Sequence, residues 1–190
     1  MSLTFKPKSD KIVELLLYLA HRLPEASKYQ AVKLFYLADK QHLERYGRPI
    51  TFETYYAMEY GPVGTTTKDL IEEKPKALAD AGISALPFEL HRTRKANGED
   101  KRVLGKPLRD TDFTLFSKSD IAVFDEVLER YGQFSFDDLY DETHRHDAYT
   151  QAWAKRGTSK RYPMDYAEMI EEPGRRAALL AELGPVAAFL

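Results

Sequence analysis

The segment YDETHRHDAY, residues 140–149, has the highest density of side chains that could do chemistry. It holds two carboxylates and two histidines at helical spacing. Asp141 and His144 are at i,i+3, and Glu142 and His146 are at i,i+4, so each pair would share a helix face. Such a group can bind a metal ion or exchange protons. A helix C-terminus also favours histidine for electrostatic reasons alone. A metal-dependent or acid–base enzyme that uses His144 and His146 is therefore the third of three hypotheses.

Other catalytic signals do not support an enzyme. The sequence contains no GxSxG, GxxxxGK[ST], GxGxxG or HExxH motif. It has no cysteine, which excludes disulfides, thiolate nucleophiles and zinc sites with sulfur ligands. We therefore expect a protein that is not an enzyme, with no catalytic residue, no metal site and no cofactor.

A strongly basic segment suggests a binding function instead. From Arg92 to Arg109 there are seven basic and two acidic residues, whereas residues 110–172 contain 15 acidic and seven basic residues. FELHRTRK and KRVLGK flank ANGED, and Asn97-Gly98 is a strong signal for a hairpin turn. The second hypothesis is accordingly a nucleic-acid-binding or regulatory protein that uses a basic hairpin at residues 91–109. The alternative explanation is a solvated loop.

The overall composition limits these choices. The chain has 190 residues, 43% of them hydrophobic, which suits a single domain with a hydrophobic core. Its net charge of −2 argues against nucleic-acid binding over the whole surface. No apolar stretch reaches the length of about 18 residues that a membrane span needs, and the apolar N-terminus suits a core helix. We expect a cytoplasmic protein that does not bind membranes.

The periodicity of apolar residues predicts a mostly helical α+β single domain with a small antiparallel sheet and a hairpin. Ser27 and Gln30 form a capping-box pattern at the start of a helix, and Gly47 is a natural C-terminal stop for the same helix. Thr65 or Thr66 is expected to cap a later helix. The predicted elements are helices at 9–23, 28–46, 65–73, 117–132, from 135 onward and near 166–172, a strand at 55–60, a hairpin at 88–107 and a final apolar segment after Pro173-Gly174.

The segment YGPVG, residues 60–64, follows the predicted strand. Pro62 fixes its own φ and disfavours a helical conformation for Gly61. Gly64 then offers a permissive backbone before the next helix. We therefore expect a corner between strand and helix.

Three segments together resemble the Panacea domain of SocA-like antitoxins. The first contributes Lys33, Leu34, Tyr36 and Ala38, the second Tyr60, Gly61, Pro62 and Val63, and the third Thr143 and His144 in a helix–Tyr-Gly–helix–Thr-His arrangement. Two departures are Met58 and Tyr149, which stand where many relatives have tryptophan. Both substitutions keep side-chain bulk, so the resemblance in fold holds.

The resemblance implies a Panacea-like domain over residues 1–164, with its core match at about 10–153 and the basic hairpin as an insertion at 88–109. Residues 165–190 would be a docked C-terminal helical segment. It also implies the first hypothesis, a bacterial or phage antitoxin that neutralises a cognate toxin, encoded by an adjacent gene, through direct protein contact. The expected contact residues are tyrosines around the strand and cations of the hairpin: Tyr55, Tyr56, Tyr60, Pro62, Arg92, Arg94, Lys95, Lys101 and Arg102.

Overall fold

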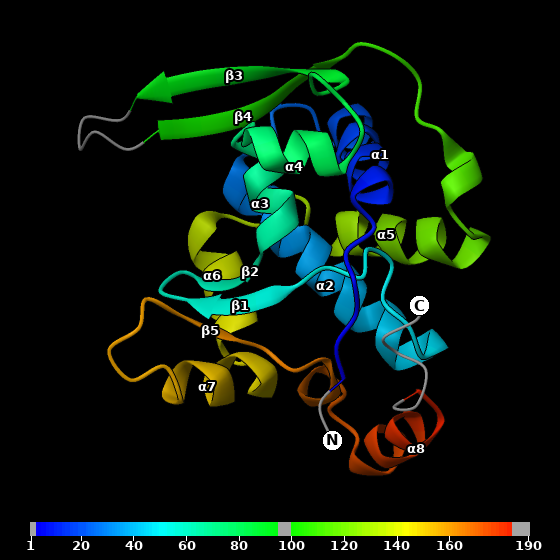
Figure 1. Ribbon diagram of the computed structural model, residues 1–190, viewed down its shortest axis with the longest axis vertical. Helices are drawn as coiled ribbons and strands as arrows, with labels where there is room; N and C mark the ends of the chain where they lie inside the picture. Colours follow the sequence, from blue (N-terminus) through cyan, green and yellow to red (C-terminus); the bar gives the residue numbers. More distant parts are fainter. Residues whose placement is uncertain (1–2, 95–99, 184–190) are drawn as a thin grey trace.

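Helices form most of the described chain, and two small antiparallel sheets complete it (Figure 1). The computed structural model describes residues 3–94 and 100–183. The helices are α1 (Ser9–Arg22), α2 (Lys28–Tyr46), α3 (Thr65–Ile71), α4 (Pro75–Asp80), α5 (Lys118–Tyr131), α6 (Phe136–His144), α7 (Asp147–Ala154) and α8 (Pro173–Leu183), with 3₁₀ turns η1 (Phe113–Leu115) and η2 (Tyr166–Met169). The strands are β1 (Tyr55–Met58), β2 (Gly61–Gly64), β3 (Phe88–Arg94), β4 (Asp100–Pro107) and β5 (Arg161–Pro163). The predicted α+β class is confirmed.

Helix α2 lies at the centre of the molecule and contacts α3, α5, α6 and β2 (Figure 1). Its ends follow the predicted signals. The Ser27 hydroxyl accepts a hydrogen bond from the Gln30 amide in a complete capping box, and Gly47 ends the helix at φ 76°. Because neighbours surround the helix, Leu34 is fully buried.

The YGPVG segment differs from the expected corner. Residues Gly61–Gly64 form β2, which pairs antiparallel with β1 so that Pro62 lies opposite Ala57. The chain reverses at Glu59-Tyr60, and the strand order is β2-β1-β5. Pro62 is tolerated because β2 is an edge strand. The prediction of a corner between a strand and a helix was therefore wrong, because the chain reverses at Glu59-Tyr60 and residues 61–64 form a second strand.

The cap of α3 also differs from the prediction. The N-cap residue is Gly64, and no threonine side chain caps the helix. Instead, the buried carboxylate of Glu53 accepts hydrogen bonds from the Thr66 amide at 3.0 Å and from the Thr67 amide at 2.7 Å. An anionic acceptor at a helix N-terminus satisfies the unpaired amides more strongly than a hydroxyl does.

Two prolines begin helices: α4 was not predicted, whereas α8 lies in the C-terminal segment, residues 165–190, that was expected to be helical. Pro75 is the first residue of α4 and Pro173 the first residue of α8, where a missing amide hydrogen costs nothing. The strand β5 and the separate helix α7 were also missed. The predicted helix near 166–172 is a 3₁₀ turn, η2, capped by Asp165.

The basic hairpin is confirmed as β3 paired with β4, and it projects from the body of the molecule (Figure 1). Its predicted Asn97-Gly98 turn lies outside the described residues. At the other end of the chain, Tyr166 donates a hydrogen bond to the Glu53 carbonyl at 2.8 Å, and Leu179 of α8 is buried. The domain division at residue 164 stays a prediction.

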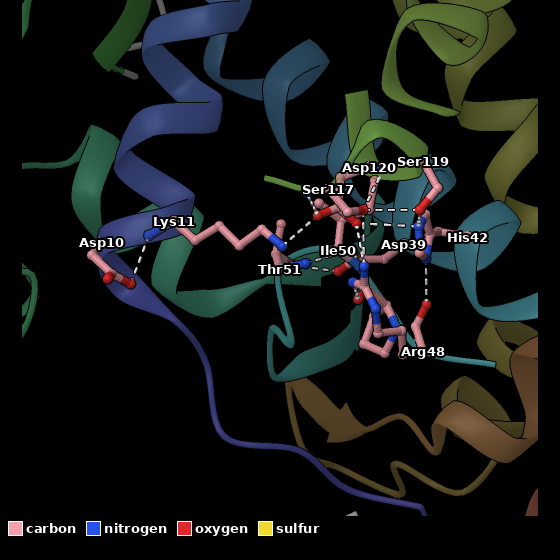
Figure 2. A network of polar contacts seen from close by, with 11 residues as sticks. Asp10, Lys11, Asp39, His42, Arg48, Ile50, Thr51, Ser117, Ser119 and Asp120 are labelled. Atoms are coloured by element: carbon pink, nitrogen blue, oxygen red, sulfur yellow. Dashed lines mark hydrogen bonds and ion pairs between the residues drawn. The ribbon is translucent and has the colours of Figure 1, made fainter. Parts of the chain in front are cut away.

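A buried polar network ties α1, α2 and α5 together (Figure 2). One oxygen of the Asp120 carboxylate lies 2.7 Å from the Lys11 ammonium, and the other lies 3.1 Å from His42 and 2.9 Å from Arg48. Burial alone would raise the pKa of Asp120, but hydrogen bonds from His42 and Lys11 outweigh burial and hold this pKa well below its usual range. The network therefore connects α5 with α1 and α2.

Candidate functional site

Segments from three distant parts of the chain meet at one largely buried point around Gly61. The Lys33 ammonium, on α2, donates a hydrogen bond to the Pro62 carbonyl in β2 at 2.8 Å. Gly61 has φ +97°, and a Cβ atom there would lie 2.7 Å from Lys33 Nζ and 3.0 Å from both Thr143 Oγ1 and His144 Cε1. A side chain at position 61 would therefore force the Lys33 ammonium to shift, in addition to the strain of the positive φ. The residues singled out in the sequence at 33, 60–63 and 143–144 therefore form one cluster.

Lys33 is unusual because it is buried without a counter-charge. Its side chain is 1% exposed, and its partners within the described chain are the Pro62 carbonyl and the face of the Tyr29 ring, 5.0 Å from Nζ. Burial lowers the pKa of Lys33 well below its ordinary value. A buried ammonium with so few partners reduces the stability of the free protein.

The other members of the first segment are structural. Leu34 and Tyr36 are fully buried, and Ala38 is 1% exposed. The Tyr36 ring packs against Tyr55 at 5.4 Å and against His146 at 5.6 Å between ring centroids. These three side chains therefore pack in the core, whereas Lys33 contacts the cluster at Gly61.

Aromatic rings extend from this cluster in a continuous strip. Phe136 contacts Tyr29 at 4.3 Å and Tyr60 at 6.1 Å, and Tyr140 stacks on His144 at 3.5 Å between ring centroids. Tyr60 is 51% exposed and Phe136 is 48% exposed. We call this set the aromatic strip: Tyr29, Tyr60, Phe136, Tyr140, His144, Tyr149 and Trp153.

A groove of about 620 Å³ opens beside the strip. Tyr29 and Val32 line it from α2, Met58 and Val63 from the β1–β2 hairpin, and Trp153 from α7. We call it the Trp153 groove. Exposed aromatic side chains next to an apolar groove are typical of protein–protein contact surfaces.

The predicted tyrosine anchors take different positions. Tyr55 is 1% exposed and donates a hydrogen bond to the buried Asp39 carboxylate at 2.9 Å. Tyr56 is half-buried beneath the Arg161 guanidinium, which lies 4.7 Å from its ring centroid. Because β1 pairs with β2 and β5, its edges are not free. Pro62 is also buried, so Tyr60 is the predicted anchor that faces solvent.

The hairpin cations lie apart from this cluster. Arg92 forms an ion pair with Glu73, and Arg102 donates a hydrogen bond to the Ile71 carbonyl at 2.9 Å, so both attach the hairpin to the end of α3. Lys101 is exposed. Lys95 and the side chain of Arg94 lie outside the described part of the structure. The nucleic-acid hypothesis for this hairpin stays a prediction.

The two histidines of the 140–149 segment point to different places. His144 joins the aromatic strip, and its Nδ1–H donates to the Tyr140 carbonyl at 2.7 Å. His146 lines a separate cavity of about 530 Å³, 3.8 Å from the Glu142 carboxylate, and burial lowers its pKa to about 4. Among residues 3–94 and 100–183, no three His, Asp or Glu side chains are placed to hold a metal ion. The fold therefore does not bring His144 and His146 together into one catalytic site.

Most of the aromatic strip was not predicted from the sequence. Phe136, Tyr140 and His144 are spaced four residues apart, which places them on one face of α6. That spacing was visible in the sequence and would have predicted this part of the strip. Trp153 had no comparable signal, because α7 was not predicted.

Comparison with known protein families gives one match. The model described as antitoxin SocA-like, Panacea domain, matches residues 32–150. The match covers more than half of the chain and includes all three segments of the cluster at Gly61. Neither the curated proteins nor the solved structures gave a match. Within the described residues, no helix is long and apolar enough to cross a membrane.

Proposed function

Because the chain belongs to the family of SocA-like antitoxins with a Panacea domain, we propose that it neutralises a cognate toxin by direct protein–protein contact. The toxin is encoded by an adjacent gene, and the complex forms in the cytoplasm. The protein acts by binding and catalyses no reaction.

The aromatic strip is the observation that supports this proposal. Tyr60 and Phe136 together present two large, half-exposed rings beside a groove. Tyrosine and other aromatic side chains contribute much of the binding energy of protein interfaces at little entropic cost. The strip also surrounds Gly61, where the family's sequence segments meet. We therefore assign toxin binding to this face.

A growth experiment tests the proposed function. The adjacent gene is induced in bacteria with and without this protein. We expect growth arrest when the neighbour is expressed alone, and restored growth together with co-purification when both proteins are present. A neighbour that is harmless alone and does not co-purify would contradict the proposal.

A further inference from the structure

Positive charge surrounds the Trp153 groove. Its cationic lining residues are Lys28, Lys33, Lys68, Arg156 and Lys160, and its acidic lining residue is Glu59. Lys28 and Lys68 share one carboxylate, because each lies 2.9 Å from Glu72. Their hydrogen bonds and charges lower the pKa of Glu72 to about 2, although burial alone would raise it. Lys68 also lies 3.4 Å from Asp69, so the positive charge that has no ion-pair partner among the described residues belongs, apart from the buried Lys33, to Arg156 and Lys160, which line the groove.

Apolar side chains form much of the surface between these cations. Trp153 and Met58 line the groove, and the Arg156 guanidinium stacks on the indole, 3.8 Å from the ring centroid. Arg156 Nη1 donates a hydrogen bond to the Trp153 carbonyl at 2.9 Å, and stacking leaves the other guanidinium donors available to an anion. The groove thus combines an apolar wall with positive charge on several sides.

Lys33 connects the groove to the Gly61 cluster. It lines the groove, although its side chain is 1% exposed, and it lacks an ion-pair partner among the described residues. An apolar side chain of similar length would fill the same space without the cost of burying an amine. The position of Lys33 is therefore better explained by an anion that arrives from outside than by the stability of the free chain.

The geometry points to a specific occupant, and this inference rests on the proposed function. We propose that the toxin places in the Trp153 groove a segment with adjacent apolar and acidic side chains. The apolar side chain packs against Trp153 and Met58. The carboxylate lies beside Lys160 and Lys33, and supplies an ionic partner that neither side chain has among the described residues. A protein segment fits better than a nucleic acid because the walls between the cations are apolar.

The single tryptophan makes this contact measurable. Trp153 is the one tryptophan of the chain, so protein labelled with 5-fluorotryptophan gives one ¹⁹F resonance, and that resonance comes from the groove. We expect the resonance to shift when the unlabelled product of the adjacent gene is added. Titration calorimetry with the same partner provides the dissociation constant.

Charge variants identify what the groove recognises. Lys33→Met and Lys160→Glu should each weaken binding at least tenfold, whereas Lys33→Arg should bind more tightly than Lys33→Met. Lys76→Glu on α4 is the matched control, because the Lys76 side chain is 86% exposed and does not line the groove. The control should bind within twofold of the unmodified protein. If Lys33→Met does not fold, the surface variants Lys160→Glu and Arg156→Glu decide the question.

The possible results separate the inference from the proposed function. Tight binding that is unchanged in the charge variants, with an unshifted Trp153 resonance, would overturn the inference and leave toxin neutralisation intact. A 20-nucleotide DNA or RNA that shifts the resonance and displaces the partner would also overturn it, in favour of nucleic-acid binding. A neighbour that neither stops growth nor binds would contradict both.

Discussion

At the scale of single residues, Gly61 explains why the YGPV segment has its composition. Its backbone adopts φ +97°, which disfavours any side chain, and the ammonium of Lys33 occupies the space that a Cβ atom would need. The next residue, Pro62, supplies the carbonyl that Lys33 binds. The residue types of this segment are therefore explained both by its contact with α2 and by the geometry of its own turn.

Replacing Gly61 with alanine tests this explanation. Gly82 is the matched control, because it has φ +69° but no atom within 4 Å of a Cβ built on it. Gly82→Ala should lower the free energy of unfolding by about 1–2 kcal/mol through backbone strain alone. Gly61→Ala adds a collision with Lys33 and should cost about 1–3 kcal/mol more. Equal losses in urea denaturation would show that the close packing at Gly61 has no energetic role.

His146 should make the stability of the protein sensitive to mild acid. Burial, reinforced by the charge of Lys40, lowers the pKa of His146 to about 4 in the folded state, against about 6.5 in an unfolded chain. The unfolded state therefore takes up the proton first as pH falls. Stability should decrease between pH 6.5 and 4, by about 3 kcal/mol at most from this residue.

The variant His146→Gln isolates this effect. It removes the titrating group while keeping a side chain that can hydrogen bond to Tyr36, which now lies 3.2 Å from His146 Nδ1. The unfolding free energy of the variant should vary less steeply between pH 6.5 and 4.5 than that of the unmodified protein. Parallel pH profiles for the two proteins would show that His146 does not become protonated on unfolding in this range.

At the scale of elements, α5 and α6 begin with the same capping arrangement in different surroundings. Ser117 and Asp120 form the capping box of α5, and Ser135 and Asp138 form that of α6. Asp120 is 1% exposed and contacts Lys11, Arg48 and His42, whereas Asp138 is exposed. Comparing Asp120 with Asp138 therefore distinguishes the stability contributed by a cap from the stability contributed by the buried network in Figure 2.

Alanine substitutions at these two positions should have unequal effects. Asp120→Ala leaves the buried Lys11 and the half-buried Arg48 without their shared carboxylate and should cost about 3–5 kcal/mol. Asp138→Ala loses the cap alone and should cost much less. Thermal and urea unfolding measure both. Similar losses for the two variants would mean that the network contributes little beyond capping.

The elements that the sequence predicted correctly have local signals. The helix that begins after Ser27 and the hairpin at 88–107 were predicted from a cap and from alternating residues around a turn, and the structure confirms both. The strand β2 was missed because glycine and proline usually end strands, whereas here residues 61–64 pair with β1 and Pro62 accepts a hydrogen bond from Lys33. Glu53 had no capping signal, because it lies 13 residues before the amide it caps at Thr66.

At the scale of the whole molecule, the candidate site depends on contacts between distant segments. The family resemblance singled out residues 33, 60–63 and 143–144, which the structure brings together, and the match over residues 32–150 confirms the family. These residues meet around Gly61 because of the way α2, α6 and α7 pack. The aromatic strip and the Trp153 groove depend on the same packing, which local sequence patterns do not encode. Tyr55 was placed among the contact residues for the same reason, because alternation along a strand does not tell which face is covered.

A binding measurement with purified proteins tests most directly whether this chain neutralises a toxin through the aromatic strip. The double variant Tyr60→Ala, Phe136→Ala removes the two half-exposed rings of the strip. Phe113→Ala is the control, because Phe113 is similarly exposed, at 49%, but packs on Tyr18 outside the strip.

The unmodified chain should form a stable complex with the product of the adjacent gene. The double variant should stay folded and bind at least about 100-fold more weakly, at the hot-spot scale of about 2 kcal/mol per ring, while the control binds within threefold. No complex with the unmodified chain, or equal affinity of the double variant, would contradict direct neutralisation through this surface.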